Sequence, residues 1–345
     1  MRLTIEFALL CLLLAAQLGL HAAVAGRYIF SDELNYMSYG ERIHGGQVIY
    51  RDFFETHAPG NAFLAALLYG LPDPWLGARL LVGAVQAATT FLIFIIGLRI
   101  SGKPAALVAA FLYALWEPVF GGMWFVAEPF VSLLFTAAML CAFLLPKRER
   151  AAGLFLWGLF TGAAVVFKLK AGWLALISAS FLIWQGMLRR RGDAVAFAGG
   201  FVLPVAAVAA CLLAQGAAGN AVRNLSAYVI AEASSGYAGF FTLSEFEPYV
   251  LLIFAVSFIC ALAARPPSPK DREGVLLWCW LAAGLLLAFP RFNLFRAAVA
   301  LPPLALMLAG LVAGETDKRL ARGAALLVLL LSAGLACVVV SALTG

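Results

Sequence analysis

Charged residues are scarce in this sequence. They make up 12% of the 345 residues, whereas hydrophobic residues make up 64% and the mean hydropathy is +0.96. A soluble domain carries about 25% charged and about 45–50% apolar residues, and a core of this length could not hide so much apolar side chain. The composition therefore excludes a soluble globular protein and predicts an all-α, polytopic membrane protein.

The sequence also lacks paired cysteines and a continuous basic segment. Its six cysteines show no CxxC spacing and lie in apolar runs, which is typical of packing residues and not of disulfides or metal ligands. The net charge of +6 would indicate nucleic acid only if the basic residues clustered on one soluble face. They fall in short groups between apolar runs, so we expect no nucleic-acid partner.

Apolar runs long enough to cross a bilayer, about 20 residues, recur along the chain. We predict eleven transmembrane helices, near residues 5–25, 76–98, 104–117, 125–146, 151–167, 170–188, 194–215, 248–264, 274–289, 294–313 and 322–343. The apolar stretch 61–71 is short and is interpreted as interfacial or re-entrant. The first 25 residues could also be a signal peptide. We favour an uncleaved span, and either alternative leaves residue 27 on the far side.

The basic residues set the orientation of these helices. Most of the 24 Lys and Arg residues form compact clusters in short loops on the side of the N-terminus, which is therefore predicted to be cytoplasmic. Most of the 18 acids and all three histidines lie on the other side. Two extracytoplasmic loops, 26–75 and 216–247, are long enough to carry a site. We expect residues 1–345 to form one transmembrane domain in the inner (cell) membrane, with its active site outside the cytoplasm.

Two adjacent acids, Asp32 and Glu33, follow the first apolar run. Ser31 can cap a helix that begins there, and the helix dipole would stabilise both acids. Neighbouring residues on a helix point about 100° apart, so the acids should differ in role. One can face a substrate while the other faces the protein or water. The alternative is that both only cap an interfacial helix.

Helical spacing adds partners for the first acid. Asp32 shares one stripe with Asn35, Tyr36 and Tyr39, at intervals of three and four residues. The pair Gly45-Gly46 can end this helix.

The motifs that follow resemble the GT-C glycosyltransferases, most closely the protein O-mannosyltransferase and lipid A aminoarabinose transferase group. The Asp-Glu pair is followed by Tyr50-Arg51-Asp52 and by a basic residue before a proline, in His57-Ala58-Pro59-Gly60. That group commonly has Lys-Pro-Pro at the last position. This chain departs from it, and neutral imidazole is a weaker partner for an anion than Lys is.

Three later segments resemble further marks of the same group. Glu128-Pro129 stands at the start of a predicted span, and Gly162-Ala163-Ala164-Val165-Val166-Phe167-Lys168 is an apolar segment ending in Lys at the outer face. Phe289-Pro290-Arg291-Phe292-Asn293, followed by Leu301-Pro302-Pro303, resembles the late motif of the group. The resemblance covers most of the chain in topology.

The resemblance implies a GT-C-like fold and a membrane glycosyltransferase, a hexosyl- or pentosyltransferase. Its donor would be a sugar linked to polyprenyl phosphate, and its acceptor would be a lipid, glycan or protein of the cell envelope. Membrane lipids would be its other partners. Such a reaction needs a base, phosphate-binding cations and a dry groove. Asp32 is the first candidate for the base and Glu33 the second. The substrate-binding candidates are Tyr36, Arg51, Asp52, His57, Glu128, Lys168, Lys170, Arg291 and Arg296.

Several alternatives stay open at this level. One member of the pair Lys168 and Lys170, and one of Arg291 and Arg296, could be a membrane anchor. Glu128 could bind a divalent metal with Asp32 or only pair with a Lys; no cofactor is firmly implied.

A lipid-linked sugar flippase or transporter is the competing function. It would need ionisable groups near the bilayer midplane and broken helices there. The depths of Arg79, Glu117 and Glu128 decide between these readings. A non-catalytic scaffold would leave the one-sided acids and histidines unexplained.

Overall fold

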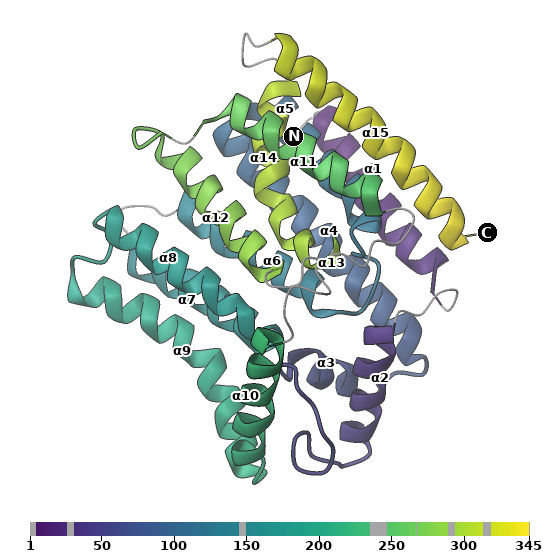
Figure 1. Cartoon of the computed structure of the whole chain (residues 1–345), viewed down its shortest axis with the longest axis vertical. Coiled ribbons are helices and arrows are strands. Elements are labelled where there is room, and N and C mark those ends of the chain that lie inside the picture. The colour runs from purple at the N-terminus through teal and green to yellow at the C-terminus, as the bar shows by residue number, and fades with distance from the viewer. Residues whose placement is uncertain are drawn as a thin grey trace.

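The computed structural model of the chain describes residues 5–25, 31–144, 150–234, 247–266, 268–288, 294–312 and 319–344. These residues are helical and include no β-strand beyond one isolated bridge between Ile49 and Phe53 (Figure 1). The helices are α1 Ile5–Ala23, α2 Ser31–His44, α3 Gly60–Leu68, α4 Pro74–Ile100, α5 Gly102–Val119, α6 Ala127–Leu144, α7 Arg150–Phe167, α8 Gly172–Trp184, α9 Arg191–Ala214, α10 Ala218–Ser234, α11 Glu247–Ala264, α12 Arg272–Ala288, α13 Leu294–Ala297, α14 Leu301–Val312 and α15 Arg319–Thr344, with 3-10 turns η1 Leu169–Ala171 and η3 Ala298–Ala300.

The class predicted from composition is confirmed: this is an all-α, multi-pass membrane protein. Each predicted apolar range overlaps a helix. One range covers η1 and α8 together, and another covers α13, η3 and α14. Among the described residues, six helical segments are long and apolar enough to cross a bilayer. Eleven crossings stay a prediction. Helix α3 has 9 residues and spans roughly 14 Å at 1.5 Å per residue, too short to cross.

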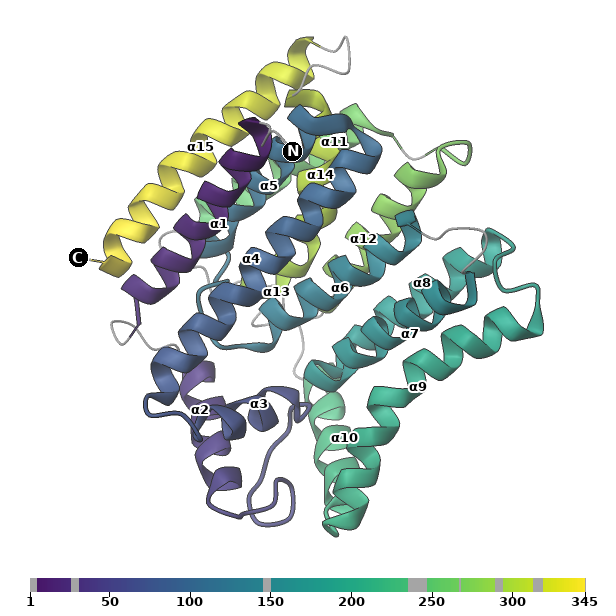
Figure 2. The ribbon, with the colours of Figure 1, turned by 180° about the vertical axis from the view of Figure 1, so that it is seen from behind.

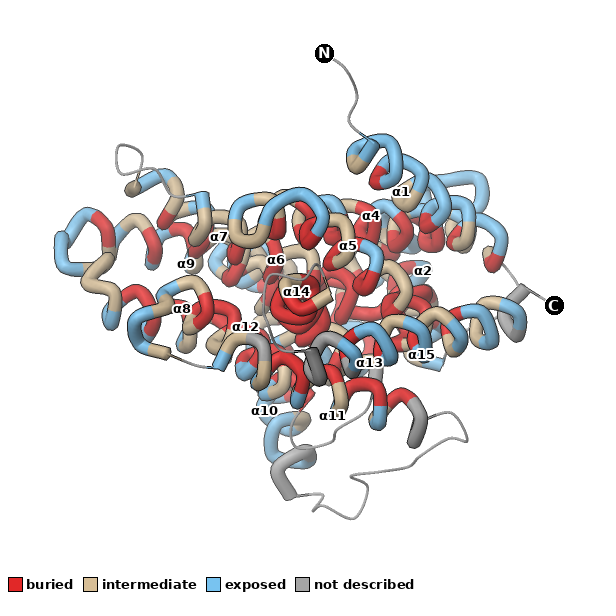
Figure 3. The backbone as a smooth tube through the Cα atoms, turned by 90° about the horizontal axis from the view of Figure 1, so that it is seen from above, coloured by how far each residue is buried: buried red, intermediate tan, exposed pale blue. Residues whose placement is uncertain are grey.

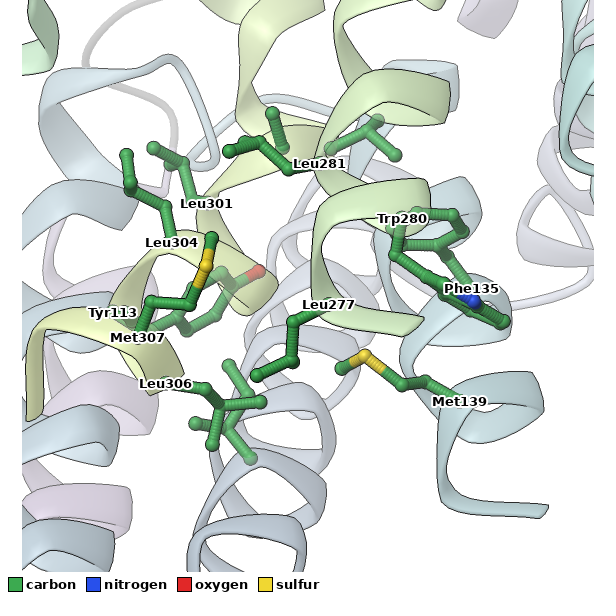
Figure 4. Packing of buried hydrophobic residues seen from close by; sticks show 14 of the residues in the cluster. Tyr113, Phe135, Met139, Leu277, Trp280, Leu281, Leu301, Leu304, Leu306 and Met307 are labelled. Carbon is green, nitrogen blue, oxygen red and sulfur yellow. The ribbon is translucent and has the colours of Figure 1, made fainter. Parts of the chain in front are cut away.

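Helix α14 forms the centre of the bundle. All but two of its 12 residues are buried, and Figure 3 shows it end-on, surrounded by the other helices. The same buried core includes Phe135 of α6 and Trp280 of α12, whose ring centroids lie 4.4 Å apart (Figure 4). Lipid provides no hydrophobic driving force for helix association. Close packing of side chains is therefore what stabilises the contact between helices in the membrane. The buried α14 in turn fixes α13, which carries Arg296.

Helices α7 and α9 are in backbone contact. A Cβ atom at Gly200 of α9 would lie 2.0 Å from the carbonyl oxygen of Phe155, and one at Gly158 of α7 would lie 2.0 Å from that of Phe197. Small residues at helix interfaces allow this close approach in membranes. The two helices therefore form one unit, and they supply the walls of a groove described below.

This contact predicts opposite effects at two neighbouring glycines. We expect Gly200→Ala to lower the free energy of unfolding by about 1–3 kcal/mol, because the methyl group meets a backbone carbonyl that cannot move aside. Gly199 has no atom within 4 Å of its Cβ position, so Gly199→Ala should be neutral or stabilising, since Gly weakens a helix interior by about 0.5–1 kcal/mol. Unfolding in mixed micelles measures both; equal effects would contradict the contact.

Helices α2, α3 and α10 lie at one end of the molecule, as both the front and back views show (Figures 1 and 2). Helix α3 is held tightly against the end of α7, because a Cβ at Gly60 would lie 2.8 Å from the carbonyl oxygen of Val166. That approach brings the segment before α3, which contains His57, to the end of α7, next to Lys168.

Candidate active site

Helix α2 presents its polar stripe as the spacing predicts. The helix begins at Ser31 and ends at His44, where the Gly45 N–H donates to the Glu41 carbonyl and Gly46 has a φ of +91°. Such a left-handed glycine is a common helix stop. Its stripe lines a hollow that we call the second pocket. The second pocket is lined by Asp32, Asn35, Tyr36, Tyr39, Phe54, Glu55, Thr56 and His57.

Asp32 also opens into another hollow, the first pocket, built from segments far apart in the sequence. They are the start of α2, the loop before α3, the start of α6, the α7–η1 junction, α10 and α13. The first pocket is lined by Asp32, Tyr36, Thr56, His57, Ala58, Val126, Ala127, Glu128, Phe167, Lys168, Leu169, Lys170, Tyr228, Phe295 and Arg296. Acids and cations from four of these six segments converge here, which is typical of a site that binds a ligand.

Burial and the neighbouring charges shift the pKa of the Asp32 carboxyl. Burial has the largest effect and raises the pKa of its carboxyl; the charge of Glu128 also raises it, while His57, Arg296 and Lys168 lower it. The pKa remains above its ordinary value. A carboxylate with a raised pKa is a stronger base, and a general base works best when its pKa approaches the operating pH.

Cationic side chains also line the first pocket. Lys168 has an extended backbone between α7 and η1, and its ammonium group is paired with the Glu128 carboxylate. Lys170 follows on η1, and Arg296 comes from α13. The side chains of Glu128 and Lys168 are 5% and 16% exposed, so their pairing is little screened by water. The pocket can therefore hold an anion beside the carboxylate of Asp32.

His57 is held in a fixed orientation by Glu55. The Glu55 Oε1 atom accepts from His57 Nδ1 at 2.7 Å and from the backbone N–H groups of Thr56 and His57 at 2.7 and 2.6 Å. Burial raises the pKa of Glu55, but the hydrogen bonds from His57 and Thr56 outweigh burial, and the pKa lies below its ordinary value. Glu55 is therefore a charged partner for the ring that lines both pockets.

The Tyr50-Arg51-Asp52 segment supports this loop and lies outside both pockets. Tyr50 is buried with a φ of +66°, and its hydroxyl donates to the His57 carbonyl at 2.6 Å. A non-glycine residue with positive φ is strained and often marks a functional loop. Arg51 pairs with Asp52 on the surface at 2.9 Å and donates to the Gln215 carbonyl. The structure thus places Arg51 and Asp52 away from the other candidates.

Glu33 is separated from Asp32 by the fold. Its carboxylate is fully buried; Oε2 accepts from Arg79 Nη2 at 2.7 Å and Oε1 from the Phe125 N–H at 3.0 Å. Arg79 Nη1 donates to the Met123 carbonyl at 2.6 Å. Glu33 therefore joins α2, α4 and the α5–α6 loop, and it lines neither pocket. This placement favours Asp32 over Glu33 as the base.

The remaining sequence candidates divide in the same way. Tyr36, His57, Glu128, Lys168, Lys170 and Arg296 line the first pocket together with Asp32. Arg291 lies outside the described residues. Within the described residues, no group of three or more His, Cys, Asp or Glu side chains is arranged to hold a metal ion.

Sequence reasoning did not select Thr56, Tyr228 and Phe295 of the first pocket, nor Glu55 of the second. The only available signal was for Tyr228, because it lies in the predicted second extracytoplasmic loop among interleaved aromatic and polar residues. The rings of Tyr228 and His57 are 5.1 Å apart, although the residues come from different loops. No local pattern marks that contact.

An apolar groove continues from the first pocket. It shares Ala58 and Leu169 with that pocket and runs between α7, α9 and α10. The rest of its lining is Pro59, Val165, Val166, Val205, Val208, Ala209, Leu212, Leu213, Ala218, Ala221, Val222 and Leu225. The groove is suited to a hydrocarbon chain whose polar head lies in the first pocket.

Solved structures share this arrangement of helices. ArnT from Cupriavidus metallidurans, bound to undecaprenyl phosphate, is 17% identical with a TM-score of 0.68, over 92% of this chain and 62% of ArnT. The Archaeoglobus fulgidus oligosaccharyltransferase in the apo form is 14% identical with a TM-score of 0.63, over 99% of this chain and 56% of its own. AglB from the same organism, in complex with an inhibitory peptide and a dolichol-phosphate, has the same identity and TM-score.

This chain therefore spans about 62% and 56% of the lengths of those two proteins. No protein-family model matches the sequence, and no curated protein matches it. At such low identity the likeness concerns architecture. The sequence resemblance is confirmed at that level: the chain has the GT-C fold of polytopic membrane glycosyltransferases.

Proposed function

We propose that this chain is a glycosyltransferase that moves a sugar from a polyprenyl-phosphate donor to a hydroxyl of an acceptor. The reaction takes place on the extracytoplasmic face of the inner membrane. The observation that carries the proposal is that Asp32, Lys168 and Arg296 line one pocket although they are far apart in the sequence. A base opposite a group of cations is what displacement of a lipid phosphate requires.

The donor occupies the first pocket and the apolar groove. Its phosphate lies against Lys168, Lys170 and Arg296, where Arg provides a fork of donors and Lys a point charge. Its prenyl chain follows the groove between α7, α9 and α10. Support comes from the solved structures with the same fold, because ArnT is bound to undecaprenyl phosphate and AglB to a dolichol-phosphate.

The reaction is a displacement at the anomeric carbon. Asp32 accepts the proton of the acceptor hydroxyl as its oxygen forms the new bond to that carbon. The bond between the carbon and the phosphate oxygen breaks, and the polyprenyl phosphate leaves with the electron pair. Lys168 and Arg296 stabilise the negative charge on the leaving phosphate. His57 borders the same space, oriented by Glu55.

The positions of three buried charges disfavour transport. Arg79 lies in the second turn of α4, Glu117 in the last turn of α5 and Glu128 in the first turn of α6. All three lie near helix ends. Each is also engaged, with Glu33, His21 and Lys168 respectively. A transporter would place such groups near the bilayer midplane.

Loss of the cations should weaken donor binding. We expect Lys168→Gln and Arg296→Gln each to weaken the binding of undecaprenyl phosphate by about tenfold or more, the effect of one lost charge-assisted hydrogen bond. Binding is measured in nanodiscs by microscale thermophoresis. Lys168→Arg, which keeps the charge, should retain binding, and Arg51→Gln is the matched control outside the pocket.

Proteoliposomes test the activity itself. Wild-type protein is supplied with a radiolabelled polyprenyl-phosphate sugar and an envelope extract as the acceptor source. We expect label in a new glycosidic product that withstands mild acid, which cleaves the donor. Label that crosses the bilayer with no new glycosidic bond would overturn the proposal in favour of transport.

A further inference from the structure

We propose that the second pocket is the acceptor subsite, and that the acceptor is an uncharged sugar. The inference rests on the proposed function, because it assigns the partner of the same base. Its basis is the wall that the second pocket shares with the first, and its own lining of aromatic, amide and carboxylate side chains.

The two pockets meet at the candidate base. Asp32, Tyr36, Thr56 and His57 line both of them. Asp32 therefore borders both pockets. A hydroxyl in the second pocket can reach the Asp32 carboxylate while a donor fills the first, which is the geometry that a displacement needs.

The lining of the second pocket differs from that of the first. Beyond the shared wall it adds two aromatic rings, Tyr39 and Phe54, one amide, Asn35, and one carboxylate, Glu55. Phe54 is 68% exposed, so its ring is accessible to a ligand. Aromatic faces pack against the C–H faces of sugar rings, while amides and carboxylates bond their hydroxyls.

Glu55 brings a carboxylate to this pocket. Its Oε1 atom accepts three hydrogen bonds, its Oε2 atom is buried, and the carboxylate also interacts with the Tyr39 phenol. A sugar hydroxyl that enters beside Tyr39 and Glu55 would meet a donor and an acceptor. Burial first, and the Glu55 charge next, raise the pKa of Tyr39 to about 12, so its phenol remains a donor.

The charge of the pocket argues against an anionic acceptor. Lys168, Lys170 and Arg296 all line the first pocket, whereas no Lys or Arg among the described residues lines the second. Arg42 lies near Tyr39, but its guanidinium is over the Phe53 ring at 5.4 Å from the centroid. Asp32 and Glu55 would repel a phosphate group, so the pocket selects neutral hydroxyls.

Saturation-transfer NMR on the full chain in nanodiscs tests the proposal. The probes are methyl glycosides of glucose, galactose and mannose, with methyl phosphate and an N-acetyl serine methylamide as anionic and peptide alternatives. We expect signal from at least one methyl glycoside and none from methyl phosphate. Asn35→Ala, at an exposed position, and Tyr39→Ala should each reduce the glycoside signal by about fivefold. Tyr39→Phe should retain most of it, because the ring remains.

The same samples separate the two proposals. Lys168→Gln should lose undecaprenyl phosphate binding and keep the glycoside signal. If glycoside signals are absent, or if Asn35→Ala and Tyr39→Ala leave them unchanged, the acceptor assignment is wrong while donor binding is unaffected. Stronger signals from the serine amide or methyl phosphate would replace the sugar with a peptide or an anionic acceptor. If wild type does not bind undecaprenyl phosphate, the proposed function itself fails.

Discussion

Asp32→Asn is expected to abolish sugar transfer while the protein still folds and inserts. A general base contributes about 10²–10⁴-fold to a rate, and an amide cannot accept the proton of the acceptor hydroxyl. Asp32 is also the one described acid that lines both pockets, since Glu128 lines only the first and is paired with Lys168, and Glu55 lines only the second and holds His57. No other carboxylate described at this site is placed to substitute for it.

The stability of this variant distinguishes a catalytic acid from a structural one. The pKa of Asp32 is raised in the folded protein, so the folded state binds the proton more tightly than the unfolded state does. The protonated carboxyl of Asp32 therefore stabilises the folded state at low pH, and this stabilisation is lost as pH rises through the raised pKa. At neutral pH the ionised carboxylate disfavours folding, and Asp32→Asn should leave stability unchanged or increase it.

The pH dependence follows from the same shift. Transfer needs ionised Asp32, so kcat/KM should fall as pH drops through a pKa above the ordinary aspartate value of 3.8. The measurement is a pH profile of transfer in nanodiscs, with Asp52→Asn as the control, because Asp52 lies in the surface pair with Arg51. Full activity of Asp32→Asn would rule out the base assignment.

Arg79→Ala is expected to cause the largest loss of stability. It would leave the Glu33 carboxylate, which is fully buried, without its cation, and removing one partner of a buried ion pair costs about 3–5 kcal/mol. The same change removes the hydrogen bond from Arg79 to the Met123 carbonyl. Because the α5–α6 loop leads to Glu128 in the first pocket, donor binding should weaken as well.

A double-variant cycle tests this pair. Glu33→Gln with Arg79→Ala should recover part of the stability, since no charge is then left unpaired. Unfolding in mixed micelles gives the free energies, and Asp52→Ala, which breaks an exposed pair, is the control with a much smaller effect. Additive effects of Glu33→Gln and Arg79→Ala would show that the two side chains do not interact.

The pair also explains why two adjacent acids have different roles. Helical spacing predicts that Asp32 and Glu33 point in different directions, and this inference needs only the 100° rotation between neighbours. It cannot say which of them faces the protein. That depends on Arg79, which stands 46 positions along the chain and meets Glu33 only because α2 packs against α4.

The Tyr50-Arg51-Asp52 motif shows the opposite case. A motif rich in polar groups beside a proposed site predicts substrate contact, yet Arg51 and Asp52 pair on the surface and Tyr50 turns inward to hold the His57 carbonyl. The left-handed backbone at Tyr50 reverses the direction of its side chain. Such a conformation depends on the buried surroundings of the loop and has no signature in residue type.

The sequence by itself determined the membrane class, the ranges of most helices and the stripe that contains Asp32. These properties depend on neighbours within a few turns, because hydropathy and helical periodicity are local. The tertiary structure alone decided that Asp32, Lys168 and Arg296 share a pocket, and that Glu33 does not. Asp32, Lys168 and Arg296 are each more than a hundred positions apart. They meet because packing around α14 and the close contact between α7 and α9 fix where the helices end.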